Sequence, residues 1–250
     1  FVAQEVAKDK KIPHFNKEAV EEIIEEARRR ANKKGHLTLK LRDLGGLIRA
    51  AGDIAVATNA SFVTKQDVID AHEISRTLEH QISDKEIAER KSYESIITKG
   101  SRKGRVNCLA VTGSGEDFSG IVVPIETQAT KKQGSSHVVL SGNVGQIMRE
   151  AANNVISVLE TLGIIEGHNY YVQFLTGHKI KGKDTVTLAI ATALYSAIKN
   201  IPVKQDVAIT GGLSVRGDAL RVEGISEKIH TAIEAGFKKV LVPKANIDDI

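Results

Sequence analysis

The chain contains 250 residues, of which 41% are apolar and 26% charged, and its formal net charge at neutral pH is +4. This composition is ordinary for a soluble globular protein and leaves room for one large domain or two smaller ones. The single cysteine, Cys108, excludes an intrachain disulfide framework and agrees with a reducing cytosol. Eight scattered histidines without an HExxH or CxxC spacing predict no metal site. No signal peptide is visible, and the longest apolar-leaning run, Val186–Ile198, is too short to span a bilayer.

Residues 1 to about 90 show helical periodicity, beginning at Phe1 in the middle of a pattern, which indicates a fragment of a longer protein. The first clear helix, in FNKEAVEEIIEEARRRA, follows Asn16 as an N-cap. Its apolar stripe contains Val20, Ile23, Ile24 and Ala27. A second helix lies in LTLKLRDLGGLIRAAGDIAVA, with an apolar stripe of Leu41, Leu44, Leu47, Ile48 and Ala51. A third follows the cap residue Thr64, and a charged helix tail and linker occupies residues 83–95.

Two arginines on the second predicted helix, Arg42 and Arg49, lie two turns apart. They belong either to a solvated helix face or to a contact with a nucleotide phosphate held by a neighbouring domain. Arginine suits the second task because its planar fork is always charged and binds phosphate at two points.

Beyond residue 95 the pattern becomes mixed. RVNCLAVTG, GIVVPIETQAT, SSHVVLSG and YYVQFLTG are short, β-rich and bounded by glycine. Helical patterns alternate with them, and the strand-like QDVAITGGLSVRGDALRV and the buried strand KKVLVP close the chain. The TGSGED segment between two strands predicts a hairpin turn, and no Gly-x-x-x-x-Gly-Lys phosphate loop occurs. The sequence therefore predicts an α+β protein with a helical first part and a mixed α/β second part.

The segment KGKDTVTLAIATALYSAI begins an apolar helix with a hydroxyl, Thr185, directly after Asp184. Both residue types cap helices, so the segment has a purely structural interpretation. Lys228, early in the helix ISEKIHTAIEAGF, is by itself a surface lysine. A lysine activates a hydroxyl only when its amine is neutral, which burial favours, and only the fold can bring positions 185 and 228 together. The intervening ITGGLSVRG offers backbone N–H groups and the hydroxyls of Thr210 and Ser214 near an oxyanion.

Several long motifs carry a resemblance to a known family. The stretch NIPVKQDVAITGGLSVRGDALRVEGISEKIHTAIEAGFKKVLVPKAN closely resembles the C-terminal protease domain of Lon, the ATP-dependent protease, and GRVNCLAV and SGIVVPI are similar to the start of that domain. FVAQEVAKDKKIPHFNKEAV and LTLKLRDLGGLIRAAGDIA resemble the small helical subdomain of its AAA+ module, in the membrane-associated archaeal type. The resemblance implies a helical AAA+ small subdomain over residues 1–82, a linker over 83–98 and a Lon-type proteolytic domain over 99–250.

The resemblance also implies an activity. Lon is a hexameric machine that unfolds proteins with ATP and cuts them with a Ser-Lys dyad. Lys228 falls on the catalytic lysine, Thr210 and Thr192 on positions that line or support the active site, and Arg42 near the nucleotide-sensing arginine, with Arg49 as the second choice. ATP with magnesium is then bound mainly by a large ATPase subdomain outside this chain. Any membrane segment also lies outside this chain. The implied partners are unfolded or damaged proteins and further copies of the chain, with weak or secondary nucleic-acid binding, in the cytoplasm or at the cytoplasmic face of a membrane.

The chain departs from the family pattern at the nucleophile. Gly-Asp-Ser-Ala-Ser is replaced by Lys183-Asp184-Thr185-Val186-Thr187, which places Thr185 on the nucleophilic serine. The acidic residue that usually precedes the aspartate by two positions is Gly182. The threonine hydroxyl is the same kind of nucleophile, but its methyl group stiffens the side chain. Two hypotheses follow: a working Thr-Lys endopeptidase, and an inactive Lon-like domain that oligomerises and binds substrate.

Overall fold

The structure, a computed structural model, describes residues 1–31, 35–74, 85, 88, 96–112, 119–131, 137–142, 146–165, 167–175 and 183–250. The chain divides into two compact units, Phe1–Leu78 and Glu79–Asp248. The predicted linker over 83–95 lies almost wholly outside the described residues. No helix in the described part of the chain combines the length and the apolar character needed to cross a membrane.

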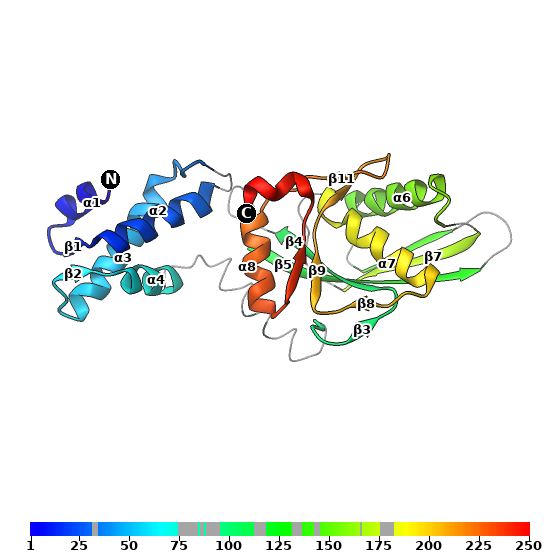
Figure 1. Cartoon of the computed structure of the whole chain (residues 1–250), viewed down its shortest axis with the longest axis horizontal. Coiled ribbons are helices and arrows are strands. Elements are labelled where there is room, and N and C mark those ends of the chain that lie inside the picture. Colours follow the sequence, from blue (N-terminus) through cyan, green and yellow to red (C-terminus); the bar gives the residue numbers. More distant parts are fainter. Residues whose placement is uncertain are drawn as a thin grey trace. The chain divides into compact units, whose positions relative to one another are not determined.

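The first unit consists of α1 (Val2–Asp9), α2 (Lys17–Ala31), α3 (Leu41–Ala57) and α4 (Lys65–Ile74) (Figure 1). Both predicted caps are present, because Asn16 Oδ1 accepts a hydrogen bond of 2.8 Å from the Ala19 N–H and Thr64 exchanges hydrogen bonds with Asp67. The structure adds β1 (His14–Phe15) and β2 (Phe62–Val63), a short parallel pair that the helical pattern does not predict. The unit is otherwise helical, as the sequence indicates.

The helical core differs in two places from the predicted stripes. Ile23 and Ala27 of α2 and Leu44, Leu47, Ile48 and Ala51 of α3 are buried as expected. Ile24 and Leu41 are instead 38% and 48% exposed. Both line an apolar groove of about 480 Å³ on this unit, which explains why apolar residues occur at positions that do not enter the core.

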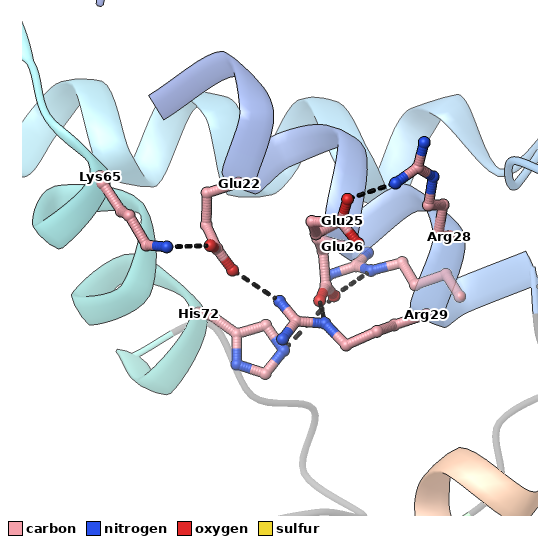
Figure 2. A network of polar contacts seen from close by, with 8 residues as sticks. Glu22, Glu25, Glu26, Arg28, Arg29, Lys65 and His72 are labelled. Carbon is pink, nitrogen blue, oxygen red and sulfur yellow. Dashed lines mark hydrogen bonds and ion pairs between the residues drawn. The ribbon is translucent and has the colours of Figure 1, made fainter. Parts of the chain in front are cut away.

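A polar network joins α2 to α4 (Figure 2). Glu26, whose side chain is only 4% exposed, lies 2.9 Å from Arg29 Nε, 2.5 Å from Arg30 Nε and 3.3 Å from His72 Nε2. Burial alone would raise the pKa of Glu26, but hydrogen bonds and positive charge from His72 and Arg30 outweigh it and lower the pKa from 4.5 to about 2. The buried carboxylate therefore stays ionised and attaches α4 to α2.

The second unit is built on a six-stranded sheet in the order β12-β9-β4-β5-β7-β6. The central strands β4 (Arg105–Thr112), β5 (Ser119–Lys131) and β7 (His168–Phe174) are antiparallel, with Thr112 opposite Ser119, so the predicted hairpin is confirmed although its turn lies outside the described residues. The flanking strands β6 (Val138–Ser141), β9 (Val207–Ile209) and β12 (Lys239–Leu241) run parallel to their neighbours. The confirmed class is α+β.

Helices cover both faces of this sheet. α6 (Gln146–Thr161) and α7 (Thr187–Lys199) share a core with the Cys108 face of β4, whereas α8 (Ile225–Ala235) packs on the opposite face against Leu109 and Val122 (Figure 1). Two small ribbons complete the unit: β3 (Ser101–Arg102) with β8 (Val203–Lys204), and β10 (Gly212–Leu213) with β11 (Ala219–Leu220).

Two predicted strands need correction. KKVLVP forms β12 as expected, but it is an edge strand with Leu241 53% exposed and is not buried. QDVAITGGLSVRGDALRV is not one strand, because the chain turns away at Gly211, whose φ is +151°, and forms β9, β10 and β11. This break brings residues 210–213, called the glycine segment below, beside the start of α7.

Candidate active site

Thr185 lies in a short 3₁₀ turn, Lys183–Val186, that leads directly into α7. Its side chain is only 5% exposed, and its backbone carbonyl accepts a hydrogen bond of 3.1 Å from the Gly211 N–H. Val186, the next residue, is fully buried in the main core. The turn is therefore fixed by the core on one side and by the glycine segment on the other.

Lys228 enters the same place from α8, on the other side of the sheet. The helix starts after Gly224, which has a φ of +67° and lies so close to Val111 that a Cβ would come within 2.8 Å of that side chain. Farther along, Gly120 lets α8 approach β5, since a Cβ there would lie 2.0 Å from Thr231 Oγ1. These two close approaches press the first turns of α8 onto the sheet and bury Lys228 completely.

The two side chains meet. Lys228 Nζ lies 3.5 Å from Thr185 Oγ1 and donates a hydrogen bond of 2.7 Å to the Glu223 carbonyl. Burial lowers the pKa of Lys228 from 10.5 to about 8, against smaller opposing effects of Cys108 and Glu223. A hydroxyl and a peptide carbonyl do not neutralise the charge, so the amine, still mostly protonated at pH 7, becomes about half neutral at pH 8.

Cys108 lies beneath the pair. Its Sγ is 3.8 Å from the Thr185 carbonyl oxygen, and burial raises the pKa of its thiol to about 12. The thiol is therefore neutral near neutral pH, where its opposing effect on the Lys228 pKa falls away and burial dominates. It is a packing residue of the site, and no motif in the sequence points to it.

The glycine segment is already engaged with the turn that carries Thr185. The N–H of Gly211 binds the Thr185 carbonyl, and the N–H of Leu213 binds Thr187 Oγ1 at 2.7 Å. Neither N–H is free for an oxyanion. The Ser214 hydroxyl accepts hydrogen bonds from the Arg216 and Asp218 N–H groups and closes the β10–β11 turn.

The supporting residues are placed differently. Thr210, 1% exposed, directly precedes Gly211, and its hydroxyl has no hydrogen-bond partner among the described residues. Thr192, two turns into α7, donates its hydroxyl hydrogen to the Leu188 carbonyl at 2.8 Å. Asp184 lies in the turn before Thr185, and its side chain is outside what the structure describes.

The two arginines of α3 differ sharply. Arg49 Nη1 forms an ion pair of 2.6 Å with Glu5 Oε2. Arg42 is exposed and has no ion-pair partner within the described residues. Within the described residues, Arg49 is therefore held by an ion pair and Arg42 is not.

The comparisons with known proteins agree with this architecture. Residues 77–250 match the family model described as Lon protease (S16) C-terminal proteolytic domain, and residues 14–77 match the Archaeal LonB, AAA+ ATPase LID domain. Proteins named Archaeal Lon protease are 49% identical in Pyrococcus abyssi, 48% in Thermococcus kodakarensis and 42% in Halobacterium salinarum, each across 100% of this chain. The chain spans only 25%, 40% and 36% of those relatives, respectively.

A buried lysine and hydroxyl on an α+β scaffold define a candidate hydrolytic site of the hydroxyl–lysine class. The family model covers more than half of the chain, and the chain belongs to the Lon protease family. The resemblance found in the sequence and its assignment to a helical lid followed by a proteolytic domain are confirmed.

Proposed function

We propose that the chain is the lid and proteolytic part of an ATP-dependent endopeptidase in which Thr185 is the nucleophile and Lys228 the general base. The observation that supports this most strongly is the fully buried amine 3.5 Å from a nearly buried hydroxyl. Two residues 43 positions apart on opposite sides of a sheet meet there, and one of them is a lysine with a lowered pKa. A structural ion pair would place a carboxylate beside the lysine, whereas a buried lysine with a lowered pKa beside a hydroxyl is typical of a functional site.

In the proposed mechanism, neutral Lys228 removes the proton from Thr185 Oγ1 as this atom attacks the peptide carbonyl. The oxyanion is held by N–H groups of the turn before α7, since those of Gly211 and Leu213 are engaged. The lysine then protonates the leaving amine, and water activated by the same amine hydrolyses the ester. The Glu223 carbonyl keeps Nζ in place through the cycle.

The main test is peptide hydrolysis by the full chain. Thr185→Ala and Lys228→Gln each abolish cleavage of an unstructured fluorogenic peptide, because one removes the nucleophile and the other the base. Thr185→Ser keeps or increases the rate, since serine lacks the methyl group that restricts the side chain. Full activity of either inactivating variant contradicts the proposal.

The alternative is an inactive Lon-like domain that oligomerises and binds substrate, in which the threonine is a remnant. Binding without cleavage separates the two: the alternative predicts that unfolded protein binds and remains intact with wild-type chain. A reversible peptide boronate gives a second criterion, because it binds a competent Thr185 hydroxyl and loses affinity in Thr185→Ala.

ATP with magnesium is the proposed cofactor, bound mainly by an ATPase subdomain outside this chain. Arg42 fits a contribution from the lid, because its guanidinium is exposed and has no ion-pair partner in the described part of the chain, whereas Glu5 holds Arg49. The described residues contain no cluster of histidine, cysteine and carboxylate groups suited to a metal ion. Arg42→Ala in a protein that includes the ATPase weakens coupling between ATP hydrolysis and degradation, while Arg49→Ala changes it less.

The proposed substrates are unfolded or damaged proteins, and the proposed assembly is a homo-hexamer. We propose a cytoplasmic location, at the membrane only through a segment outside this chain. Size-exclusion chromatography with light scattering tests the assembly directly.

A secondary contact with nucleic acid is supported by one surface. Exposed cations from distant segments converge on the β3–β8 ribbon, since Lys204 pairs opposite Ser101 and the Lys238 N–H binds the Asp206 carbonyl. None of these cations is ion-paired within the described residues, and they are Lys99, Arg102, Lys103, Lys204, Lys238 and Lys239. Binding of a DNA duplex that weakens steeply with salt, and weakens further in Lys204→Glu, supports this role; salt-independent or absent binding contradicts it.

A further inference from the structure

Thr187 is a second threonine in the KDTVT segment, two residues after Thr185. It is the first residue of α7 and is 4% exposed. Its Oγ1 accepts a hydrogen bond of 2.7 Å from the Leu213 N–H, 26 residues later in the chain. The bond therefore connects the start of α7 to β10.

Two backbone hydrogen bonds flank this contact. The Gly211 N–H donates to the Thr185 carbonyl at 3.1 Å, and the Leu188 N–H donates to the Gly211 carbonyl at 3.2 Å. Alternate residues of the glycine segment, 211 and 213, thus bind positions 185, 187 and 188. Alternate residues along one edge of a β-strand bond to the neighbouring strand in this way. Here the Thr187 hydroxyl takes the place of a backbone carbonyl as the acceptor for the Leu213 N–H.

The opposite edge of β10 is occupied as well. Gly212 and Leu213 pair with Leu220 and Ala219 of β11, and the Ser214 N–H donates to the Asp218 carbonyl at 2.8 Å. The β10–β11 ribbon can therefore move only as a unit against the turn that carries Thr185. Of the three described contacts that hold the ribbon against this turn, two are between backbone groups and the one from Thr187 is made by its side chain.

We infer that Thr187 is a positioning residue: by holding β10 against the 183–188 turn, its hydroxyl keeps Thr185 Oγ1 within reach of Lys228 Nζ. This inference rests on the proposed function of the Thr185–Lys228 pair. The separation of 3.5 Å is at the outer limit of a hydrogen bond, so the reaction has little tolerance for displacement of the turn. Loss of the Thr187 hydroxyl also leaves the Leu213 N–H without its acceptor, which favours rearrangement of this edge.

The test compares Thr187→Val, which keeps the shape but removes the acceptor, with Thr187→Ser, which keeps the acceptor. Thr187→Val is expected to lower kcat for peptide cleavage by about 10- to 100-fold with KM changed less than about threefold, because substrate binding is retained and geometry is lost. Thr187→Ser is expected to restore kcat to within about threefold of wild type. The matched control is Thr161→Val, which removes an exposed hydroxyl bonded to the Ser157 carbonyl in α6 and leaves kcat unchanged.

Amide hydrogen exchange supplies a readout that does not depend on turnover. In Thr187→Val, protection falls at Leu213 and also at Gly211, whose N–H contacts Thr185; a merely local effect changes Leu213 alone. Wild-type kcat in Thr187→Val, an unrescued Thr187→Ser, or unchanged protection at Gly211 overturns the inference. Cleavage that survives Thr185→Ala overturns the proposed function instead, so the two failures are distinguishable.

Discussion

The two units of the protein each bury an ionisable side chain and treat it in opposite ways. In the helical unit, Glu26 is surrounded by Arg29, Arg30 and His72, and its pKa falls to about 2 (Figure 2). In the second unit, Lys228 meets a hydroxyl and a carbonyl, and its pKa falls to about 8. The first shift keeps the carboxylate charged near neutral pH; the second brings loss of the amine's charge down to about pH 8.

The difference lies in the partners rather than in the depth of burial. Desolvation disfavours the charged form in both cases, and only opposite charge reverses it. Glu26 therefore contributes attachment between α2 and α4, whereas Lys228 acquires a proton affinity close to that of a base working near neutral pH. A buried ionisable group whose desolvation is not outweighed by opposite charge is the feature that distinguishes the candidate active site from the structural network.

A carboxylate introduced beside Lys228 would make its surroundings resemble those of Glu26, and this substitution tests the comparison most directly. Cys108→Asp places a carboxylate beside the amine, which raises the pKa of Lys228 and keeps it protonated. We expect peptide cleavage at pH 8 to fall about 100-fold relative to Cys108→Asn, which has the same shape without the charge. Steady-state kinetics measure the ratio, and equal rates for Asp and Asn at position 108 would show that the state of charge of Lys228 does not limit the reaction.

Removing the carboxylate from the helical network tests the other side of the comparison. Glu26→Gln leaves Arg30 and His72 without their shared partner and is expected to destabilise the first unit by about 2 kcal/mol at pH 7. Glu25→Gln, in an exposed ion pair with Arg28, is the control and costs less than about 0.5 kcal/mol. Urea denaturation followed by circular dichroism measures both.

The same network has a defined acid response. Because the folded pKa of Glu26 lies below 4.5, its contribution is complete above about pH 4.5 and is lost as the pH falls toward about 2. Wild type and Glu26→Gln should therefore converge in stability across this window. A difference that persists unchanged at pH 2 would assign the stabilisation to packing.

The smallest expected effect is a gain in stability. Below about pH 8 the folded protein carries Lys228 as a buried cation, and this penalty decreases as the pH rises from about 8 to 10.5. Lys228→Met removes the penalty along with the Glu223 hydrogen bond, so stability at pH 7 should rise by about 1 kcal/mol while activity is lost. Thermal unfolding at pH 7 and pH 10 measures the gain, which should shrink at the higher pH; a destabilised variant would mean that the amine is better accommodated than its burial indicates.

The sequence predicted what depends on neighbours along the chain. Asn16 and Thr64 cap helices through contacts three residues away, and the β4–β5 hairpin follows from two β-rich segments joined by a glycine-containing turn. It could not predict contacts set by the fold. The ion pair of Arg49 with Glu5 spans 44 positions, and the exposed edge position of β12 has the same apolar pattern as a buried strand.

The candidate site divides in the same way. Thr185 and Lys228 were both identifiable as candidates, but each has a structural explanation when taken alone, and their meeting depends on close packing at Gly120 and Gly224. Thr187 was missed, although a second hydroxyl two residues after Thr185 was the available signal. Cys108 by itself indicates only a reducing compartment, because nothing local in the sequence places it beneath Thr185.

The central claim is that Lys228 gives up its proton near pH 8 and acts as a base in its neutral form, and the titration of its amine tests that claim most directly. Nuclear magnetic resonance of the Lys228 amine in the folded chain, with lysine labelled and Lys228→Gln used for assignment, gives the pKa without any substrate. The account predicts a value of about 8, with cleavage that rises with pH up to that value and levels off above it. A titration near 10.5, with the amine fully charged throughout the active range, would contradict it.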